Sequence, residues 1–301
     1  MSEIENVFTH GMAQISPEVY LHYVEMGSGP RTMVLLHGYP ETWRQWRHAM
    51  PLFAAAGFRV IAVDYRGAGQ SSKPDGGYDK HTMASDIQQL LAAHLGVNEP
   101  FVMVGHDIGM TVAFAFAGLY PNALEKLVLV DAVVPGTPTY KNALTTGKLR
   151  GSDLAHFFFH NARNNMAETL TAGRERVYFQ DFFDKLVFNQ EAFGAEVIDT
   201  YAAHYAAPGG MKAGFEVYRA FDQDAEDNAE MLAKSGRLKL PLLFVAGAES
   251  VIGSLAEATL SEIAENGTLV RVSRSGHYVP EENPEEFAEK VIAFCAAEQT
   301  P

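Results

Sequence analysis

The sequence predicts an α/β fold in which a mostly parallel, doubly wound sheet is interrupted by an inserted helical segment. Short runs rich in apolar and β-branched residues end at turn or polar residues and alternate with helix-like stretches, as in βαβ units. The 301 residues, 47% of them hydrophobic, can bury one large core and still carry an insertion. Between about Pro135 and Gly236 the strand pattern stops, and aromatic-rich helical sequence replaces it.

Six strands and four helices are predicted for the sheet and its flanking layers. The expected strands are Thr32–Leu36, Arg59–Val63, Phe101–Val104, Lys126–Val130, Leu242–Val245 and Thr268–Val272. The expected helices are His81–Leu95, Ile108–Tyr120, Leu255–Ala264 and Glu285–Ala297, the last of which follows Pro284. We therefore expect a core formed by residues 1–135 and 236–301, and a helical cap formed by residues 136–235.

Composition and charge restrict the compartment and the partners. A single cysteine, Cys295, permits neither an internal disulfide nor a Cys-rich zinc site, which favours a cytoplasmic protein. The first thirty residues lack a signal-peptide pattern, and no apolar stretch approaches the roughly 18 residues of a membrane span. The net charge of −14, without runs of Lys or Arg, disfavours nucleic acid and anionic membranes and favours a neutral or cationic ligand. The oligomeric state stays undecided, with a homodimer among the options.

The segment FVMVGHDIGM carries the first chemical signal. It has the spacing of the G-x-S-x-G nucleophile elbow, with Asp107 where serine would stand. Gly105 and Gly109 suit a strand that turns abruptly into a helix, because the strained turn needs small neighbours. The helix N-terminus would favour the ionised carboxylate, so Asp107 is predicted to be a nucleophile.

The alternative is that Asp107 serves only as the N-cap of the following helix, a common role for aspartate. Two distant segments favour the enzyme instead. In TMVLLHGYP the turn after the strand can offer a backbone N–H to an oxyanion, and the N–H of Ile108 would supply a second donor. In LVRVSRSGHYVPEENPEEF a histidine, His277, follows the last strand, where a general base is needed.

Taken together, HGYP, DYRGAGQSS, GHDIGM and SGHYVPEENPEEF resemble the epoxide hydrolases of the α/β-hydrolase fold and their dehalogenase relatives, over nearly the whole chain. Aspartate in place of serine at the elbow is the specific mark. Within that family the chain is most similar to the Cif-like epoxide hydrolases, on the segments VLVDAVVP, LAHFFF, ETLTAGRERVYFQDFF and FEVYRAF. The resemblance implies the α/β-hydrolase fold with a helical cap.

The resemblance also implies the roles of individual residues. Asp107 matches the nucleophile, His277 the base, and the backbone of Tyr39 and Ile108 the oxyanion hole. The acid that orients the histidine is either Asp131, which ends the strand before the cap, or Glu249 in AGAESVIG. We prefer Asp131, because its flanks VLVD and VVP match the Cif-like and fluoroacetate dehalogenase groups and an acid among apolar residues needs a partner. Its structural alternative is a turn-forming aspartate.

In the Cif-like group a histidine and a tyrosine of the cap hydrogen-bond to the epoxide oxygen, and the matching residues here are His156 and Tyr218. The alternative for His156 is a packed helix residue beside three phenylalanines. His160 lies one turn away, but without the H-E-x-x-H pattern no metal site is expected. Tyr218 is singled out by resemblance alone, and its competitors are Tyr140, Tyr201 and Tyr205.

The expected reaction is hydrolysis of a small neutral epoxide to a vicinal diol, through a covalent hydroxyalkyl ester on Asp107, with water and no cofactor. A dehalogenase is the nearest rival. Haloalkane dehalogenases commonly place Trp after the nucleophile, where this chain has Ile108, and fluoroacetate dehalogenases place Arg at the positions of Ile108 and Thr111. A non-catalytic ligand-binding protein on the same fold is the second rival. The acids Glu281, Glu282, Glu285 and Glu286 are expected to form a solvated helix start.

Overall fold

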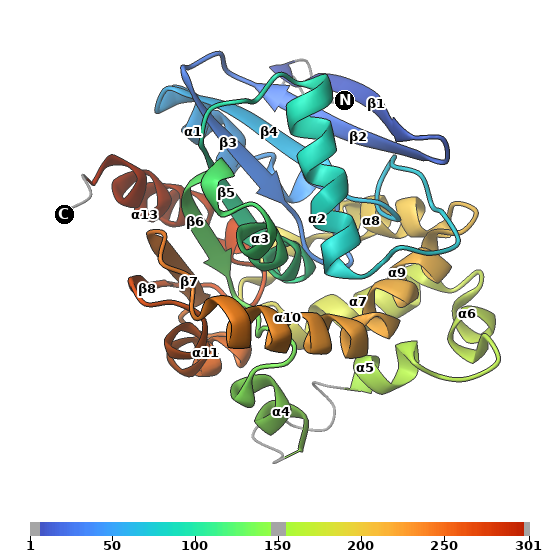
Figure 1. Ribbon diagram of the computed structural model, residues 1–301. Helices are drawn as coiled ribbons and strands as arrows, with labels where there is room; N and C mark the ends of the chain where they lie inside the picture. The colour runs from blue at the N-terminus through green and yellow to red at the C-terminus, as the bar shows by residue number, and fades with distance from the viewer. Residues whose placement is uncertain (1–6, 146–154, 298–301) are drawn as a thin grey trace.

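The computed structural model describes residues 7–145 and 155–297, and within them one sheet has the strand order β1-β2-β4-β3-β5-β6-β7-β8 (Figure 1). The strands are β1 (Thr9–Ser16), β2 (Val19–Met26), β3 (Arg31–Leu36), β4 (Phe58–Asp64), β5 (Phe101–His106), β6 (Leu124–Val130), β7 (Leu242–Gly247) and β8 (Gly267–Val272). β2 pairs antiparallel with both β1 and β4. Among the six strands β3 to β8, neighbours in the sheet pair in parallel.

The α/β prediction is confirmed, and all six expected strands are present as β3 to β8. The antiparallel hairpin of β1 and β2 was not predicted. β1 lies at the sheet edge with only two of its eight positions buried, so THGMAQIS does not read as a buried strand. β2 is half buried, and VYLHYVEM was not recognised although most of its residues are hydrophobic.

Helices cover both faces of the sheet, as the alternation of strand residues requires. Met33 and Leu35 pack into a core with α1 (Ala49–Ala55) and α13 (Pro284–Ala296). Val34 and Leu36 point into the opposite core. The helices on that side are α2 (Lys80–Gln89), α3 (Ile108–Leu119) and α11 (Ala256–Ile263) (Figure 1). A π-helical turn, Leu90–His94, extends α2 over most of the range expected for it.

The chain between β6 and β7 is helical and contains no strand in its described residues, 131–145 and 155–241. Its helices, here called the cap helices, are α4 (Pro138–Thr145), α5 (Ala155–His160), α6 (Met166–Thr171), α7 (Glu175–Leu186), α8 (Ala195–Ala206), α9 (Gly210–Arg219) and α10 (Phe221–Ser235). They gather beyond the carboxyl ends of the parallel strands (Figure 1). The division of the chain at residues 136 and 235 into core and cap stays a prediction.

Short helices complete the chain: α12 (Val279–Glu282) and the 3-10 turns Trp43–Trp46, Pro121–Ala123, Gln190–Phe193 and Ile252–Leu255. In the part of the chain that the structure describes, no helix has the length and apolar character needed to cross a membrane.

The expectation that Glu281 and Glu282 form a solvated helix start is wrong. Each is only 4% exposed. Glu282 accepts the backbone N–H groups of Gly276 and Tyr278, on either side of His277, and so holds the loop that carries this histidine. Glu281 pairs with Arg47. The sequence does not reveal that the unpaired N–H groups of this loop need a buried acceptor.

Candidate active site

Asp107 lies at the sharp turn between β5 and α3. Its φ of 49° is a conformation that costs free energy for a residue with a Cβ atom and is concentrated at functional sites. The flanking glycines are required by close packing, because a Cβ on Gly105 would lie 2.2 Å from the carbonyl oxygen of Gly109. The carboxylate of Asp107 makes no capping hydrogen bond to α3, so the interpretation of Asp107 as a simple N-cap is wrong.

A backbone N–H group contacts this carboxylate, and a second predicted donor follows it in the chain. Tyr39, in the turn after β3, donates its N–H to Asp107 Oδ1 over 2.9 Å. Ile108 is the first residue of α3, where no earlier carbonyl of the helix can accept its N–H. The turn after β3 must approach closely, since a Cβ on Gly38 would lie 2.7 Å from Asp107 Cβ. The structure therefore brings the N–H of Tyr39, one of the two predicted oxyanion-hole residues, to the carboxyl group of Asp107.

His277 lies between two carboxylates. Its Nδ1 is 2.9 Å from Asp131 Oδ2, and its Nε2 is 3.5 Å from Asp107 Oδ2. The three residues follow β8, β6 and β5 respectively, so their convergence results from the parallel sheet, whose strand ends share one edge.

Of the two candidate acids, the structure places Asp131 against the histidine. Asp131 is fully buried and also accepts hydrogen bonds from the Gly247 N–H, at 3.1 Å, and from Ser250 Oγ, at 2.6 Å. Glu249 is exposed and makes a backbone hydrogen bond to Ser275. Ser250 was missed by sequence reasoning, although its place just after β7 is where site residues are expected.

The charges of these groups depend on one another. Burial alone would raise the pKa of Asp107, but its interactions with His277, His106 and the Tyr39 N–H hold that pKa well below its ordinary value. Burial alone would lower the pKa of His277, but Asp107 and Asp131 together raise it to about 10. At neutral pH the site therefore contains an ionised Asp107 beside a protonated His277.

A buried acid that was not predicted from the sequence, Glu41, contacts His106, the residue before Asp107. Glu41 is fully buried, and its Oε2 is 3.2 Å from His106 Nδ1. Gln45 Nε2 contacts the same nitrogen at 2.8 Å, while the other ring nitrogen of His106 is 2.9 Å from the carbonyl oxygen of His277. Burial raises the pKa of Glu41 against the opposing effect of His106. An acid in HGYPE, beside apolar residues, was the available signal.

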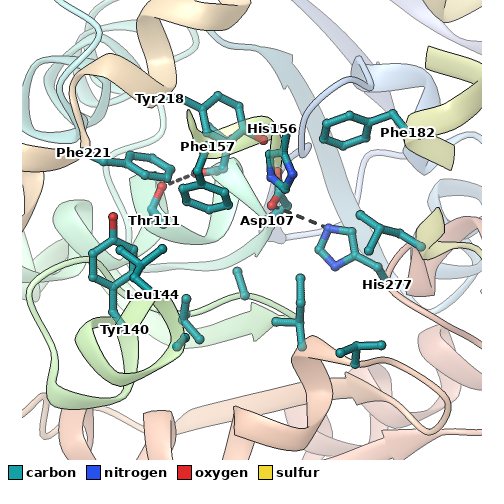
Figure 2. Close-up of a pocket in the computed structure, with 17 residues that line it drawn as sticks. Asp107, Thr111, Tyr140, Leu144, His156, Phe157, Phe182, Tyr218, Phe221 and His277 are labelled. Carbon is teal, nitrogen blue, oxygen red and sulfur yellow. Dashed lines mark hydrogen bonds and ion pairs between the residues drawn. The ribbon is translucent and has the colours of Figure 1, made fainter. Parts of the chain in front are cut away.

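Asp107 and His277 line a pocket that lies between them and the cap helices. His156 and Tyr218 also line this pocket, close to Asp107 (Figure 2). Their ring centroids are 5.5 Å apart at an interplanar angle of 89°. Tyr140 also lines the pocket, farther from Asp107 (Figure 2). Tyr201 and Tyr205 do not: the hydroxyl of Tyr201 donates to Glu281, at 3.0 Å. Geometry thus favours Tyr218 over its competitors.

The rest of the pocket wall is predominantly apolar. It consists of Ile108, Ala132, Val133, Ala143, Leu144, Phe157, Phe182, Leu186, Phe221, Val251, Ile252 and the hydroxyl-bearing Thr111 and Tyr140. Neither Lys nor Arg is among the described residues that line it. Thr111 donates its hydroxyl to the carbonyl of Ile108, over 2.7 Å. At Ile108 and Thr111 the wall therefore has no cation that could bind a carboxylate substrate.

No three His, Cys, Asp or Glu side chains gather into a metal-binding arrangement anywhere in residues 7–145 and 155–297. His160, one turn from His156, instead places its Nε2 2.5 Å from the hydroxyl of Tyr178.

The fold and the strand-to-helix turn define an α/β-hydrolase, and the family model described as "alpha/beta hydrolase fold" matches residues 31–284. The soluble epoxide hydrolase of Corynebacterium sp. (strain C12) is 34% identical to this chain over 291 residues, which cover 96% of this chain and 97% of that protein. The chain belongs to the epoxide hydrolases of the α/β-hydrolase family, and it is a hydrolase.

Solved structures share this fold. The structure of Cfl2 from Burkholderia cenocepacia is 36% identical and matches with a TM-score of 0.88 over 95% of each chain. The Cif epoxide hydrolase from Acinetobacter nosocomialis, 24% identical, matches with a TM-score of 0.86 over 96% of this chain and 89% of that one. The resemblance to epoxide hydrolases of this fold is confirmed, and its narrower part, the likeness to the Cif group, holds at the level of the fold.

Proposed function

We propose that this enzyme hydrolyses a small neutral epoxide to a vicinal diol through a covalent hydroxyalkyl ester on Asp107. The observation that carries the proposal is the ionised Asp107 between the Tyr39 N–H and His277, in an apolar pocket that His156 and Tyr218 also line. A serine at this turn would need a base to become a nucleophile, whereas an aspartate is already charged.

In the first half-reaction a carboxylate oxygen of Asp107 attacks an epoxide carbon, and the carbon–oxygen bond of the ring breaks. His156 and Tyr218 hydrogen-bond to the ring oxygen, and Tyr218 supplies the proton that the developing alkoxide needs. Burial raises the pKa of Tyr218 well above its ordinary value, so the hydroxyl carries its proton when the substrate arrives.

In the second half-reaction water attacks the ester carbonyl carbon while His277 accepts a proton from it. A histidine with a pKa near 10 is a poor base because it is already protonated. Esterification removes the negative charge of Asp107, one of the two carboxylates that raise this pKa, so the pKa of His277 falls once the ester exists. His277 then gives up its proton, and Tyr218 regains through solvent the proton that it gave to the alkoxide. The N–H groups of Tyr39 and Ile108 stabilise the oxyanion. Collapse of the intermediate breaks its bond to the diol oxygen, and the departing alkoxide takes the proton of the newly formed Asp107 carboxyl group. The diol leaves, and ionised Asp107 and protonated His277 are restored.

Removal of the Tyr218 hydroxyl should slow the first half-reaction. We expect Tyr218→Phe to reduce the rate of ester formation by about 10²-fold, because one of two donors to the alkoxide is lost. Single-turnover quench experiments measure this rate directly. Tyr201→Phe, at a tyrosine outside the pocket, is the matched control. Ester formation at the normal rate in Tyr218→Phe would assign the proton to another donor.

The two half-reactions should respond differently to pH. Asp107 has a lowered pKa and stays ionised, so ester formation should change little between about pH 8 and about pH 5. Ester hydrolysis needs neutral His277 and should slow as the pH falls below the pKa that this histidine has in the ester. Rapid-quench mass spectrometry at each pH should therefore show more ester at low pH. In Asp107→Asn, which mimics the uncharged ester, NMR titration should find the pKa of His277 below about 10.

The choice of reaction is tested by incubation with epoxides, haloalkanes and haloacids, with identification of every product. Turnover of a styrene-type or small aliphatic epoxide to its diol supports the proposal, and the absence of halide release separates it from a dehalogenase. Ile108 and Thr111 line the pocket where dehalogenases of this fold would place their halide or carboxylate ligands. Halide release without diol formation, or no turnover of any of these compounds, would contradict the proposal.

A further inference from the structure

Lys80 and Asp224 form a buried ion pair that no step of the proposed mechanism uses. Lys80 Nζ is 2.6 Å from Asp224 Oδ2, and each side chain is only 1% exposed. Lys80 begins α2, on the core side, whereas Asp224 lies in the first turn of α10, a cap helix. The first turn of α2 lies beside α10 in the fold (Figure 1). Because a buried pair of this kind is often no more stabilising than apolar residues of the same volume, stability alone does not account for it.

The pair joins the ends of three helices. Asp224 Oδ1 accepts the backbone N–H of Lys80, at 2.7 Å, in the first turn of α2, where N–H groups have no partner within the helix. Lys80 Nζ donates to the carbonyl of Val217, at 2.9 Å, in the last turn of α9. The cation thus meets the negative end of α9, and the carboxylate meets the positive ends of α2 and α10.

Tyr218 lies at the junction of α9 and α10, between the residues that Lys80 contacts. It follows Val217 directly, and Lys80 Nζ lies 4.6 Å from the ring centroid of Phe221, whose own centroid is 5.2 Å from that of Tyr218. The helix carrying Tyr218 also packs tightly on the turn after β3, since a Cβ on Gly214 would lie 2.7 Å from the Tyr39 ring. A shift of the junction between α9 and α10 would therefore move the Tyr218 hydroxyl relative to Asp107.

We propose that Lys80 and Asp224 are positioning residues for ring opening, which act by fixing the junction of α9 and α10 and thereby the distance from the Tyr218 hydroxyl to the epoxide oxygen. The inference rests on the proposed role of Tyr218. A proton donor must lie within hydrogen-bond reach of the developing alkoxide, and a displacement of about 1 Å can cost on the order of 10²-fold in rate.

The test uses the full-length enzyme with a styrene-type epoxide under single-turnover conditions, where ester formation and diol release are followed separately. Asp224→Asn keeps the shape of the side chain and removes its charge. We expect ester formation to slow by about tenfold to a hundredfold, with the rate of ester hydrolysis unchanged. In a Tyr218→Phe background the same substitution should slow ester formation no further, because it acts through the hydroxyl already removed.

Asp86→Asn is the matched control on the same helix. Asp86 pairs with Arg66, at 2.7 Å from Nη2 to Oδ1, and not with a cap helix. This variant should leave both half-reactions unchanged. If Asp224→Asn does not fold, the double variant Lys80→Met/Asp224→Leu leaves no unpaired buried charge and should fold with the same selective slowing of ester formation.

Equal slowing by Asp224→Asn in the wild-type and Tyr218→Phe backgrounds would overturn the inference, as would equal slowing of both half-reactions or normal ester formation in the folded double variant. These results leave the proposed role of Tyr218 intact as long as ester formation is slow in Tyr218→Phe. Normal ester formation in Tyr218→Phe would instead refute the proposed role of Tyr218, and with it the positioning inference.

Discussion

Asp107→Ser is expected to abolish diol formation, with a loss on the order of 10⁴-fold or more. A neutral hydroxyl lacks the carboxylate charge that makes this residue a nucleophile without help from a base. If the serine did attack, it would form an ether, which water cannot hydrolyse, so a second turnover would be impossible. The variant should also fail as an efficient esterase. Steady-state measurement of diol, with an ester substrate in parallel, gives both results.

Loss of the fold must be separated from loss of the nucleophile. Circular dichroism and thermal unfolding of Asp107→Ser should match those of the wild type, because serine fits where the elbow glycines already make space. Asp75→Ser, at an exposed aspartate that pairs with Lys212 at the surface, should retain full activity. Diol formation at an undiminished rate in folded Asp107→Ser would remove Asp107 from the role of nucleophile.

Asp131→Asn should trap the ester. Asp131 supports His277 through the 2.9 Å contact to Nδ1, and ester hydrolysis needs a base, whereas ester formation does not. We expect hydrolysis to slow by roughly 10²- to 10⁴-fold, the range found for general bases, with a smaller effect on ester formation. Intact-mass spectrometry after mixing with a small epoxide should show a mass increase equal to that of the epoxide, on the peptide that contains Asp107.

Glu249→Gln is the matched control, because Glu249 is the other candidate acid and is exposed near the same strand end. It should show far less adduct than Asp131→Asn. Adduct in Glu249→Gln but not in Asp131→Asn would transfer the orienting role to Glu249 despite the geometry.

The sequence predicts the sheet well where strands are buried on both faces. β5 begins with the apolar run FVMV and β6 ends with the apolar run LVLV, because helices cover both faces of these strands. The edge strand β1 is mostly exposed and gives no such signal, and β2, which pairs with it, is only half buried. The short helices α1 and α12 were also missed, since one or two turns carry too little periodicity to be recognised.

The local sequence pattern was sufficient to identify a site residue only where a single turn defines the chemistry. The elbow at Asp107 and the turn at Tyr39 are of this kind, because their glycines and neighbouring strand can be recognised directly. Ser250, Glu41 and Asp224 could not be found in this way. Ser250 acts through Asp131, Glu41 through His106 and Asp224 through Lys80. Each partner is at least 60 residues away along the chain, and sequence position alone does not reveal such pairs.

The origin of the new hydroxyl oxygen tests the covalent mechanism most directly. Wild-type enzyme in excess over epoxide is allowed one turnover in water enriched in heavy oxygen, and the diol and the peptide containing Asp107 are analysed by mass spectrometry. If Asp107 attacks the epoxide and water attacks the ester carbonyl, the first diol carries an unlabelled oxygen from Asp107, and the heavy oxygen remains in the carboxylate. Heavy oxygen in the diol of the first turnover, with Asp107 unlabelled, would mean that water attacks the epoxide directly and would contradict the account.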